Sequence, residues 1–436
     1  MKSTLLAGVA TVALFPAAAM AIGLDRSGQP VDILFEEGNY FELSFGRVFP
    51  SIDGEDVALP EVGYTGGAET GDVGEDFTQL GAAIKFQVTE QLSFAMIADE
   101  PYGVDVNYPG DGGSFVPSGF PLPFPQVLPV TTDEGSNNLG GSSAHVESSS
   151  LMALARYEIN DNFSVHGGLR YQRLQSEISL SGFGYGPTLS GYSATFGEDH
   201  AFGYAVGAAY ERPEIALRIA VTYFSSIEHE QDTVETLPLL AGGGTIESVT
   251  EVETPEAINI DFQTGLNQRT LLFGQLRYAW YEDVRVAPPY FDSQSDPTIP
   301  GTSLTDIEDN YAVSIGVGRA LTDRLSGSVT LGYEAKGDDL VSPLSTTNGQ
   351  KSIGLGLSYD VNDQVTVAGG VRYVSLRDAG AETGTPDTER AFFDDNHVVG
   401  VGFQVGYRFR PCWDINQRPR FGGAFSYGPA SARNGP

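Results

Sequence analysis

The sequence is poor in cysteine, in histidine and in long apolar runs. Cys412 is the one cysteine among 436 residues, so no disulfide can form within the chain and no metal site can be built from several cysteines. The five histidines have none of the spacings of a zinc site; they are His145, His166, His200, His229 and His397. Beyond residue 21, glycine and charged residues interrupt every apolar run before it reaches the length of a membrane-spanning helix.

Positive charge is also scarce, because 24 lysines and arginines face 57 acidic residues and the formal net charge is -33. Such a field repels nucleic acid. The acids are concentrated in expected loops, one of which holds Asp53, Glu55, Asp56, Glu61, Glu69, Asp72, Glu75 and Asp76. Divalent cations could bridge this loop to lipopolysaccharide, but a solvated acidic surface is the simpler explanation.

The N-terminus has the features of an export signal. Lys2 precedes an apolar stretch from Leu5 to Ala18, and Ala19-Met20-Ala21 is a small-x-small cleavage pattern. We therefore expect residues 1–21 to be a secretory signal peptide and the mature chain to begin near Ile22.

Apolar and polar residues alternate in a unit that recurs along the chain. In residues 163–171, for example, the odd positions are apolar, aromatic or glycine, and the even positions include Ser164, His166 and Arg170. This period of two is the signature of a strand with one apolar and one polar face. The side chains expected to face lipid include Phe163, Val165, Leu169, Ile215, Leu217, Val221, Val329 and Val367, and those expected to face the interior include Arg170, Arg218, Arg277 and Arg372.

Tyrosines recur at one height on these strands. Four apolar faces place a tyrosine eight residues after their first apolar residue, at Tyr171, Tyr223, Tyr333 and Tyr373. Eight residues at ~3.3 Å each span roughly 26 Å, and a tilt of about 40° leaves a height of roughly 20 Å, close to the apolar band between the aromatic girdles of an outer-membrane barrel. The opposite strand ends hold Tyr157, Tyr210, Tyr359 and Tyr407. A soluble β-sandwich has no reason to place aromatics in this way, so a membrane barrel is favoured.

Fourteen antiparallel strands are expected, near residues 40–48, 77–88, 92–99, 146–158, 163–178, 201–211, 215–228, 252–266, 270–281, 310–319, 325–334, 350–360, 364–374 and 396–409. Tight connections alternate with long ones at 49–76, 100–145, 179–200, 229–251, 282–309, 335–349 and 375–395. Short periplasmic turns and long extracellular loops are typical of an even-stranded all-β barrel in the outer membrane. Residues 40–409 would then form the barrel, and residues 410–436 a periplasmic tail.

Several segments together resemble the FadL/TodX family of outer-membrane transport proteins. They are residues 23–30 (GLDRSGQP), 35–40 (FEEGNY), 99–103 (DEPYG) and 254–265 (TPEAINIDFQTG). The resemblance runs from about Gly23 to Phe409. It implies a fourteen-stranded barrel with an N-terminal hatch that takes up long-chain fatty acids or other hydrophobic compounds and releases them sideways at a kinked third strand. Residues 22–39 correspond to the hatch, with Asp25 and Arg26 expected to pair with charges in the lumen, although the Asn-Pro-Ala motif usual in the family is absent.

The expected third strand runs into Pro101 and Gly103. Proline removes a ladder donor and glycine permits a bend, so the two residues could open a gap in the wall. The alternative is a strand that simply ends there. Together with the resemblance, this makes Pro101 and Gly103 candidates for a lateral gate.

The loop that follows is apolar and rich in proline although it is expected to be extracellular. Prolines stiffen it, and an exposed apolar patch usually marks a binding surface. We therefore expect it to capture a hydrophobic substrate, with packing into the barrel mouth as the alternative. Its candidate residues are Phe115, Val116, Phe120, Leu122, Phe124, Val127 and Leu128.

Three strands share an arginine followed by a tyrosine, at Arg170, Arg277 and Arg372. An arginine can hold a carboxylate bidentately, so these side chains could bind a fatty-acid headgroup. The simpler explanation is an internal salt-bridge network with partners such as Glu334 or Asp261.

No enzymatic activity, cofactor or metal is expected. The Gly-x-Ser-x-Gly motif is absent, and Ser164 beside His166 is better explained as a lumen-facing polar pair than as the site of an outer-membrane lipase. A general porin for polar solutes, which would show a large steady conductance, and a structural or adhesive barrel remain alternatives. The expected surroundings and partners are the outer membrane of a Gram-negative bacterium with its lipid and lipopolysaccharide, the barrel assembly machinery and a hydrophobic small molecule, with the protein as a monomer.

Overall fold

The computed structural model describes residues 23–117, 127–294, 303–305, 307–345, 347–384 and 386–410. The expected signal peptide and residues 411–436 of the expected tail lie outside the described residues. Among the described residues, no helix is both long and apolar enough to span a membrane.

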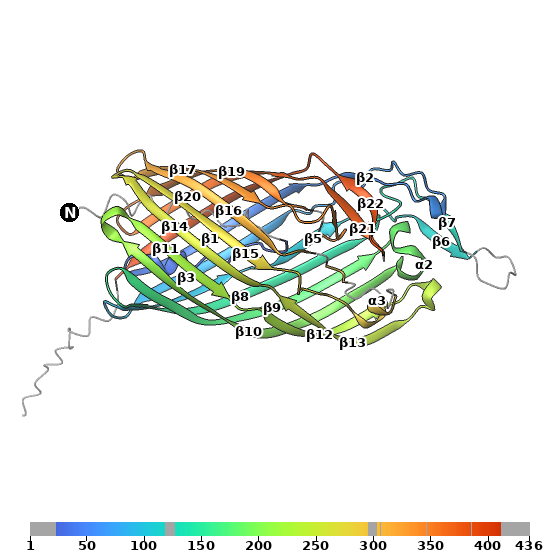
Figure 1. Ribbon diagram of the computed structural model, residues 1–436, viewed down its shortest axis with the longest axis horizontal. Coiled ribbons are helices and arrows are strands. Elements are labelled where there is room, and N and C mark those ends of the chain that lie inside the picture. The colour runs from blue at the N-terminus through green and yellow to red at the C-terminus, as the bar shows by residue number, and fades with distance from the viewer. Residues whose placement is uncertain are drawn as a thin grey trace, which may run out of the picture.

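The architecture is a closed antiparallel barrel of fourteen strands, as predicted (Figure 1). Its sheet contains 17 segments, but three strands consist of two segments each: β4 with β5, β11 with β12, and β13 with β14. One half of the wall contains β1 (Asn39–Ser51), β3 (Phe77–Gln87), β4 (Leu92–Asp99), β5 (Gly103–Asn107), β8 (Ser143–Glu158), β9 (Phe163–Leu180) and β10 (Tyr192–Arg212). The other half contains β11 (Leu217–Phe224), β12 (Ile227–Thr236), β13 (Thr245–Thr254), β14 (Glu256–Asn267), β15 (Thr270–Trp280), β16 (Asn310–Ala320), β17 (Leu325–Glu334), β19 (Gln350–Asp360), β20 (Val365–Leu376) and β23 (His397–Phe409). The barrel closes because β1 pairs with both β3 and β23.

The prediction of a loop at residues 229–251 is wrong. Residues 229–251 lie largely in strands, because β12 and β13 pair along their whole length from Ile227–Thr254 to Thr236–Thr245. The alternation persists here with polar side chains, so that His229 and Glu235 are buried while Glu228 and Glu230 are exposed. Because the outer face is mostly acidic or polar, with Val234, Ile246 and Val249 as the exposed apolar residues, the alternation does not look like that of a membrane strand. The same hairpin pairs with β10, which begins nine residues earlier than expected.

The long loops assemble a roof at the end of the barrel opposite the short turns (Figure 1). Three of them contribute to a four-stranded sheet of β2 (Gly54–Asp56), β18 (Leu340–Val341), β21 (Ala379–Thr383) and β22 (Thr388–Phe393). Asp56 anchors this sheet, because its carboxylate accepts hydrogen bonds from Ser136 Oγ (2.5 Å) and from the backbone N–H of Asn137 (2.7 Å). Burial raises the pKa of the Asp56 carboxyl, and these hydrogen bonds act in the opposite direction. The remaining elements of the long loops are β6 (Ser114–Pro117), β7 (Val127–Val130), α2 (Gly186–Leu189), α3 (Pro289–Ser293) and the 3-10 turns η3 (Pro60–Val62), η4 (Phe183–Tyr185) and η6 (Leu239–Ala241).

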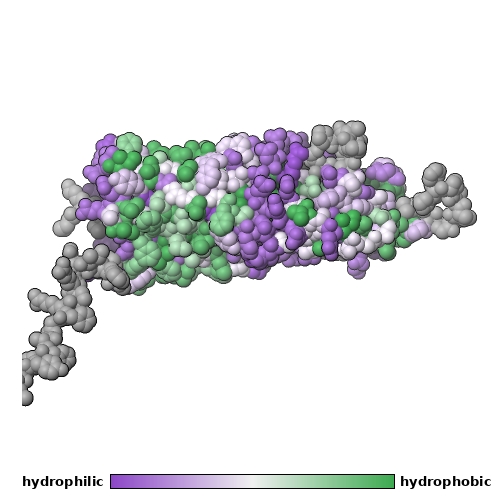
Figure 2. Space-filling model, turned by 90° about the horizontal axis from the view of Figure 1, so that it is seen from below, coloured by the Kyte–Doolittle hydropathy of each residue, from purple (hydrophilic) through white to green (hydrophobic). Residues whose placement is uncertain are grey.

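The outer surface of the barrel is apolar over its membrane-spanning part. Figure 2 shows hydrophobic residues gathered over the half that carries the short turns, and a hydrophilic belt next to them. Among the residues expected to face lipid, Phe163, Val165, Leu169, Ile215, Val221 and Val329 are exposed, and Leu217 and Val367 are half-exposed. Tyr157, Tyr333, Tyr359, Tyr373 and Tyr407 are exposed at the strand ends. The alternation therefore places apolar residues and aromatic girdles toward lipid, as predicted.

The core lies inside the barrel, where the segment that precedes β1 packs against the wall. Val31, Ile33 and Leu34 are buried in one cluster with inward-facing residues of strands between β1 and β16, among them Ala83, Ala95, Leu154, Ala205, Ala257 and Ala312. Two of these residues belong to a 3-10 turn, η2 (Asp32–Phe35). The small inward alanines leave the space that this segment fills. We call residues 23–38 the N-terminal segment.

Candidate functional site

The third strand of the wall is interrupted at the predicted residues. β4 pairs with β8 up to Asp99–Ser150, and β5 resumes the pairing at Gly103–Glu147, so the third strand has one extra residue at this point. On the other side, the β3–β4 ladder ends at Ala82–Ala98, and residues 77–81 of β3 pair only with β1. A single bridge between Gly74 and Val106 joins the two sides again farther along. Within the described residues, the wall therefore has a window between β3 and the third strand.

The backbone at the window pairs with the N-terminal segment. The Arg26 N–H donates to the Pro101 carbonyl (2.7 Å), the Gly103 N–H donates to the Leu24 carbonyl (3.0 Å), and Asp25 and Tyr102 form an antiparallel bridge. Because proline has no backbone N–H, the loss of pairing with β3 leaves no hydrogen-bond donor unpaired at Pro101. The third strand bends inward because the interior supplies the partners that β3 would otherwise provide.

The Arg26 side chain fills the window. Its guanidinium lies 4.2 Å from the centre of the Phe77 ring of β3 and forms an ion pair with Asp105 of β5 at 2.5 Å. A Cβ atom at position 103 would collide with this guanidinium, so a side chain there would displace Arg26. Beside it, the Glu100 carboxylate accepts a hydrogen bond from the Leu80 N–H. The window is therefore closed by side chains and not by strand pairing.

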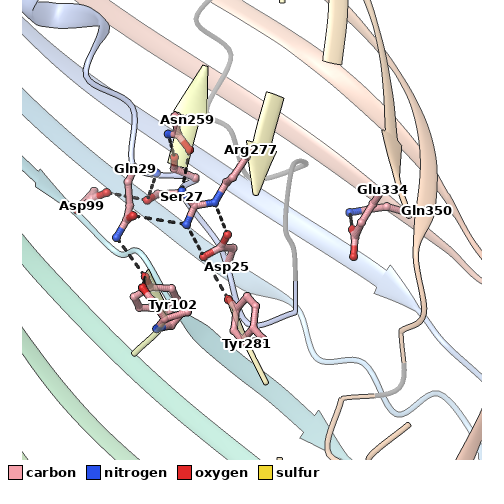
Figure 3. Close-up of polar contacts among 12 residues, drawn as sticks. Asp25, Ser27, Gln29, Asp99, Tyr102, Asn259, Arg277, Tyr281, Glu334 and Gln350 are labelled. Atoms are coloured by element: carbon pink, nitrogen blue, oxygen red, sulfur yellow. Dashed lines mark hydrogen bonds and ion pairs between the residues drawn. The ribbon is translucent and has the colours of Figure 1, made fainter. Parts of the chain in front are cut away.

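Asp25 anchors the N-terminal segment in a fully buried polar network (Figure 3). Its carboxylate pairs with Arg277 of β15 (Nε–Oδ2, 2.5 Å) and accepts a hydrogen bond from the Tyr281 hydroxyl (3.3 Å). Arg277 also donates to Asn259 (2.8 Å). Other members of the network are Ser27 with Asp99 and Gln29 with Tyr102. The buried charges of Asp25 and Arg277 are tolerated because they compensate each other and are hydrogen-bonded, whereas Asp99 has only the hydroxyls of Ser27 and Ser150 as partners.

The three arginines expected to bind a headgroup lie on the inward face but have different surroundings. Arg277 is occupied by Asp25. Arg170 is buried and donates to the Ser225 carbonyl (2.9 Å), while Arg372 donates to Ser352 Oγ (2.7 Å). The expected partners were wrong, because Glu334 and Asp261 accept hydrogen bonds from Gln350 and Gln275. Sequence spacing does not show which strands face each other across a lumen.

Two adjoining cavities lie beside the window. One, of about 160 Å³, is mainly apolar and is lined on both edges of the window, by Phe77 of β3 and by residues 103–106 of the third strand. Its other apolar lining residues are Val48, Pro50, Ile52, Leu344, Val374, Leu376 and Val398. The second, of about 480 Å³, is polar and lies between the loops that follow β15 and β17. The two share the lining residues Gly23, Glu334, Ser345, Thr347 and Gly349, so they adjoin each other. We call them the apolar cavity and the vestibule.

The expected capture loop lines neither cavity with its described residues. Phe115 packs edge-on against Phe183 at 5.5 Å, whereas Val116 and Leu128 on the β6–β7 hairpin are exposed. Phe120, Leu122 and Phe124 lie outside the described residues, as does the Val127 side chain. The described part of this loop thus includes both a packed side chain, Phe115, and an exposed apolar pair, Val116 and Leu128.

The polar pair Ser164 and His166 does not form a catalytic arrangement. His166 Nε2 hydrogen-bonds Thr222 (2.9 Å), and Ser164 accepts a hydrogen bond from Arg156 (3.1 Å). In the part of the chain that the structure describes, no group of His, Cys, Asp and Glu is arranged to hold a metal ion. The cavities and the window are thus the features that suggest a function.

Comparisons with known proteins agree with this geometry. Residues 130–411, more than half of the chain, match the family model described as outer membrane protein transport protein (OMPP1/FadL/TodX). The chain belongs to this family. Its members are transport proteins of the Gram-negative outer membrane, and their substrates are hydrophobic compounds.

Solved structures show the same fold at low sequence identity. A Pseudomonas aeruginosa FadL homologue has a TM-score of 0.66 at 12% identity, over 94% of this chain and 98% of that chain. The Pseudomonas putida toluene transporter TodX has a TM-score of 0.59 at 13% identity, over 91% and 95%. The monoaromatic hydrocarbon channel CymD has a TM-score of 0.54 at 11% identity, over 91% and 97%. No curated protein matches this chain by sequence.

Sequence reasoning missed both cavities and the residue that joins them. Glu334 appeared only as a possible partner of the inward arginines, yet it lines both cavities. The available signal was its position at the inward-facing end of a strand whose other inward residues are Ser326, Ser328, Thr330 and Gly332. Because the inward-facing residues that precede it on this strand are small, an acid at the strand end is expected to border open space in the lumen.

Proposed function

We propose that this member of the FadL/TodX family takes small hydrophobic molecules from outside the cell through the vestibule into the apolar cavity and releases them sideways into the outer membrane. The observation that carries the proposal is the position of the apolar cavity. It is lined by residues of both edges of the window, where the wall lacks strand pairing. A molecule in this cavity has only side chains between itself and the lipid.

A sideways exit suits an apolar cargo on energetic grounds. Each buried methylene is worth ~0.8 kcal/mol away from water. A chain of about twelve methylenes therefore prefers a membrane to water by roughly 10 kcal/mol. A route that leads from an apolar cavity directly into lipid preserves this preference, whereas a straight pore would expose the molecule to the periplasm.

The N-terminal segment acts as a hatch in this proposal. It is held by the Asp25–Arg277 pair in the middle of the barrel and by Asp32–Arg218 and Glu36–Arg408 nearer the short turns. Because Leu24 and Arg26 supply the hydrogen-bond partners of the bent third strand, a movement of the segment would alter the window directly. The hatch thereby blocks the straight route and shapes the sideways one.

Capture begins outside the barrel, at the β6–β7 hairpin. Exposed Val116 and Leu128 support this part of the proposal, because apolar residues displayed on an extracellular hairpin have no packing role there. Long-chain fatty acids and other hydrophobic compounds, including monoaromatic hydrocarbons, are the candidate substrates.

The proposal is tested by removing the arginine side chain that fills the window. Arg26→Ala removes the side chain that lies between Phe77 and Asp105 and leaves the backbone pairing of the N-terminal segment in place. We expect the variant, reconstituted in liposomes, to take up labelled toluene and labelled palmitate several-fold faster than the wild type. Arg47→Ala is the control, because it removes an arginine from the exposed pair with Asp76. An unchanged rate for Arg26→Ala, in a barrel shown to be folded by heat-modifiable gel migration, would contradict exit through this window.

A further inference from the structure

Glu334 is a buried acid at the junction of the two cavities. It is the last residue of β17, is 7% exposed and lines both the vestibule and the apolar cavity. Its Oε2 accepts a hydrogen bond from Gln350 Nε2 at 2.6 Å, in a part of the lumen separate from the Asp25 network (Figure 3). Of the five residues that line both cavities, Glu334 is the one with an ionisable side chain.

Glu334 has no basic partner among the described residues, like Glu42, Asp99 and Asp261, but unlike these three acids it lines both cavities. Asp25, Asp32, Glu36 and Asp105 each pair with an arginine. Among the described residues, Glu334 forms no ion pair. Arg372, on a strand nearby, donates instead to Ser352. A buried carboxyl group without a cation is costly to keep charged, so a cationic ligand at this point would be favoured.

The approach to Glu334 is also acidic. The described lining of the vestibule includes Glu282, Glu308, Asp309 and Asp338, and Arg285 is its only basic residue. A cleft lined by one sign of charge raises the local concentration of oppositely charged molecules. In the apolar cavity the one arginine, Arg26, already pairs with Asp105. A carboxylate would therefore be repelled on the way in and would find no free cation in the cavity.

The size of the apolar cavity limits the hydrocarbon part of a ligand. An apolar cavity of roughly 150 Å³ in a protein interior can bind benzene, and this cavity measures about 160 Å³. One aromatic ring, or an alkyl group of similar volume, therefore fits.

We propose that Glu334 binds the protonated amine of a small apolar amine whose hydrocarbon part occupies the apolar cavity. The inference rests on the proposed function and makes it specific: the preferred cargo is an apolar cation and not a fatty acid. Gln350 positions the Glu334 carboxyl by its hydrogen bond to Oε2.

Four probes of one ring each separate charge from hydrophobicity. Benzylamine, benzyl alcohol, toluene and benzoate differ only in the group on the ring, and an amine like that of a lysine side chain is protonated at pH 7. Binding of each labelled probe to the full-length purified barrel in mild detergent would be measured by equilibrium dialysis. We expect benzylamine to bind at least tenfold more tightly than toluene, and benzoate to bind most weakly.

Glu334→Gln is the deciding variant, because it keeps a hydrogen-bonding side chain beside Gln350 and removes the charge. It is expected to weaken benzylamine binding about tenfold more than toluene binding, so that the preference for benzylamine is lost. Glu230→Gln, on the exposed outer face of β12, makes the same change in net charge away from the cavities and should bind all four probes like the wild type.

Three results would overturn the inference: equal binding of benzylamine and toluene by the wild type, preference for benzoate, or a Glu334→Gln variant that retains the preference for benzylamine. In each of these cases the proposed function survives, because a neutral or anionic apolar probe still binds. Failure of all four probes to bind the folded wild type would overturn the inference and the proposed function together.

Discussion

At the residue scale, Asp25 and Arg277 decide whether the N-terminal segment stays in the lumen. Both side chains are fully buried, so each depends on the other for compensation of its charge. Removing one partner of a buried pair leaves an unpaired buried charge, which typically costs about 3–5 kcal/mol, whereas replacing both can be nearly neutral.

The Asp25–Arg277 ion pair predicts that the losses of stability caused by substituting its two members are not additive. Arg277→Met should destabilise the barrel by about 3–5 kcal/mol in guanidinium unfolding and release the N-terminal segment to added protease. Asp25→Asn together with Arg277→Met should recover most of that stability, because no buried charge remains. A loss in the double variant that equals the sum of the losses in Asp25→Asn and Arg277→Met would show that the two residues act independently.

At the scale of elements, the N-terminal segment lies in the lumen and packs against strands between β1 and β16. On the opposite side of the lumen, β16 to β20 present mostly small residues such as Ser328, Gly354 and Gly370. The segment therefore provides most of the bulk that closes the barrel.

Deletion of residues 23–38 should consequently raise conductance. In planar bilayers we expect the wild type to conduct little and the deletion variant to show large, steady channels, since the remaining inward residues are small and polar. A correctly folded deletion variant whose conductance matches the wild type would mean that the segment is not a plug.

Sequence patterns captured the elements that follow local rules and missed those that depend on distant contacts. Alternation gave the strands because lipid on one face and a lumen on the other impose a period of two. Pro101 and Gly103 gave the interruption of the third strand because their effects on the backbone are local. The hairpin of β12 and β13 was missed because its outer face is mostly polar, and the partner of Arg277 was missed because Asp25 is more than 250 positions away.

At the scale of the whole molecule, one face of each strand must meet lipid. Val329 lies midway along β17, between Leu325 and Tyr333, and is exposed on the outer face. An arginine at the midplane of the bilayer costs about 2–4 kcal/mol on the lipid face of a barrel. Val329→Arg should therefore lower the free energy of unfolding in lipid by that amount, while Glu230→Arg on the hydrophilic belt should change it little. Equal effects would mean that the apolar band does not mark the membrane.

The central claim is that cargo leaves through the window between β3 and the third strand. The Leu80 backbone reaches the Glu100 side chain across this window. Cysteines at both positions, in a Cys412→Ser background, allow the edges to be joined by a cleavable thiol cross-linker. Leu331→Cys with Ile353→Cys is the matched control, because these residues face each other on intact, fully paired strands.

The decisive measurement is uptake of labelled toluene and palmitate into liposomes before cross-linking, after it, and after reduction. We predict that uptake falls to the level of protein-free liposomes when residues 80 and 100 are joined, returns after reduction, and is unaffected in the control pair. Wild-type uptake through a completely cross-linked window would contradict lateral release.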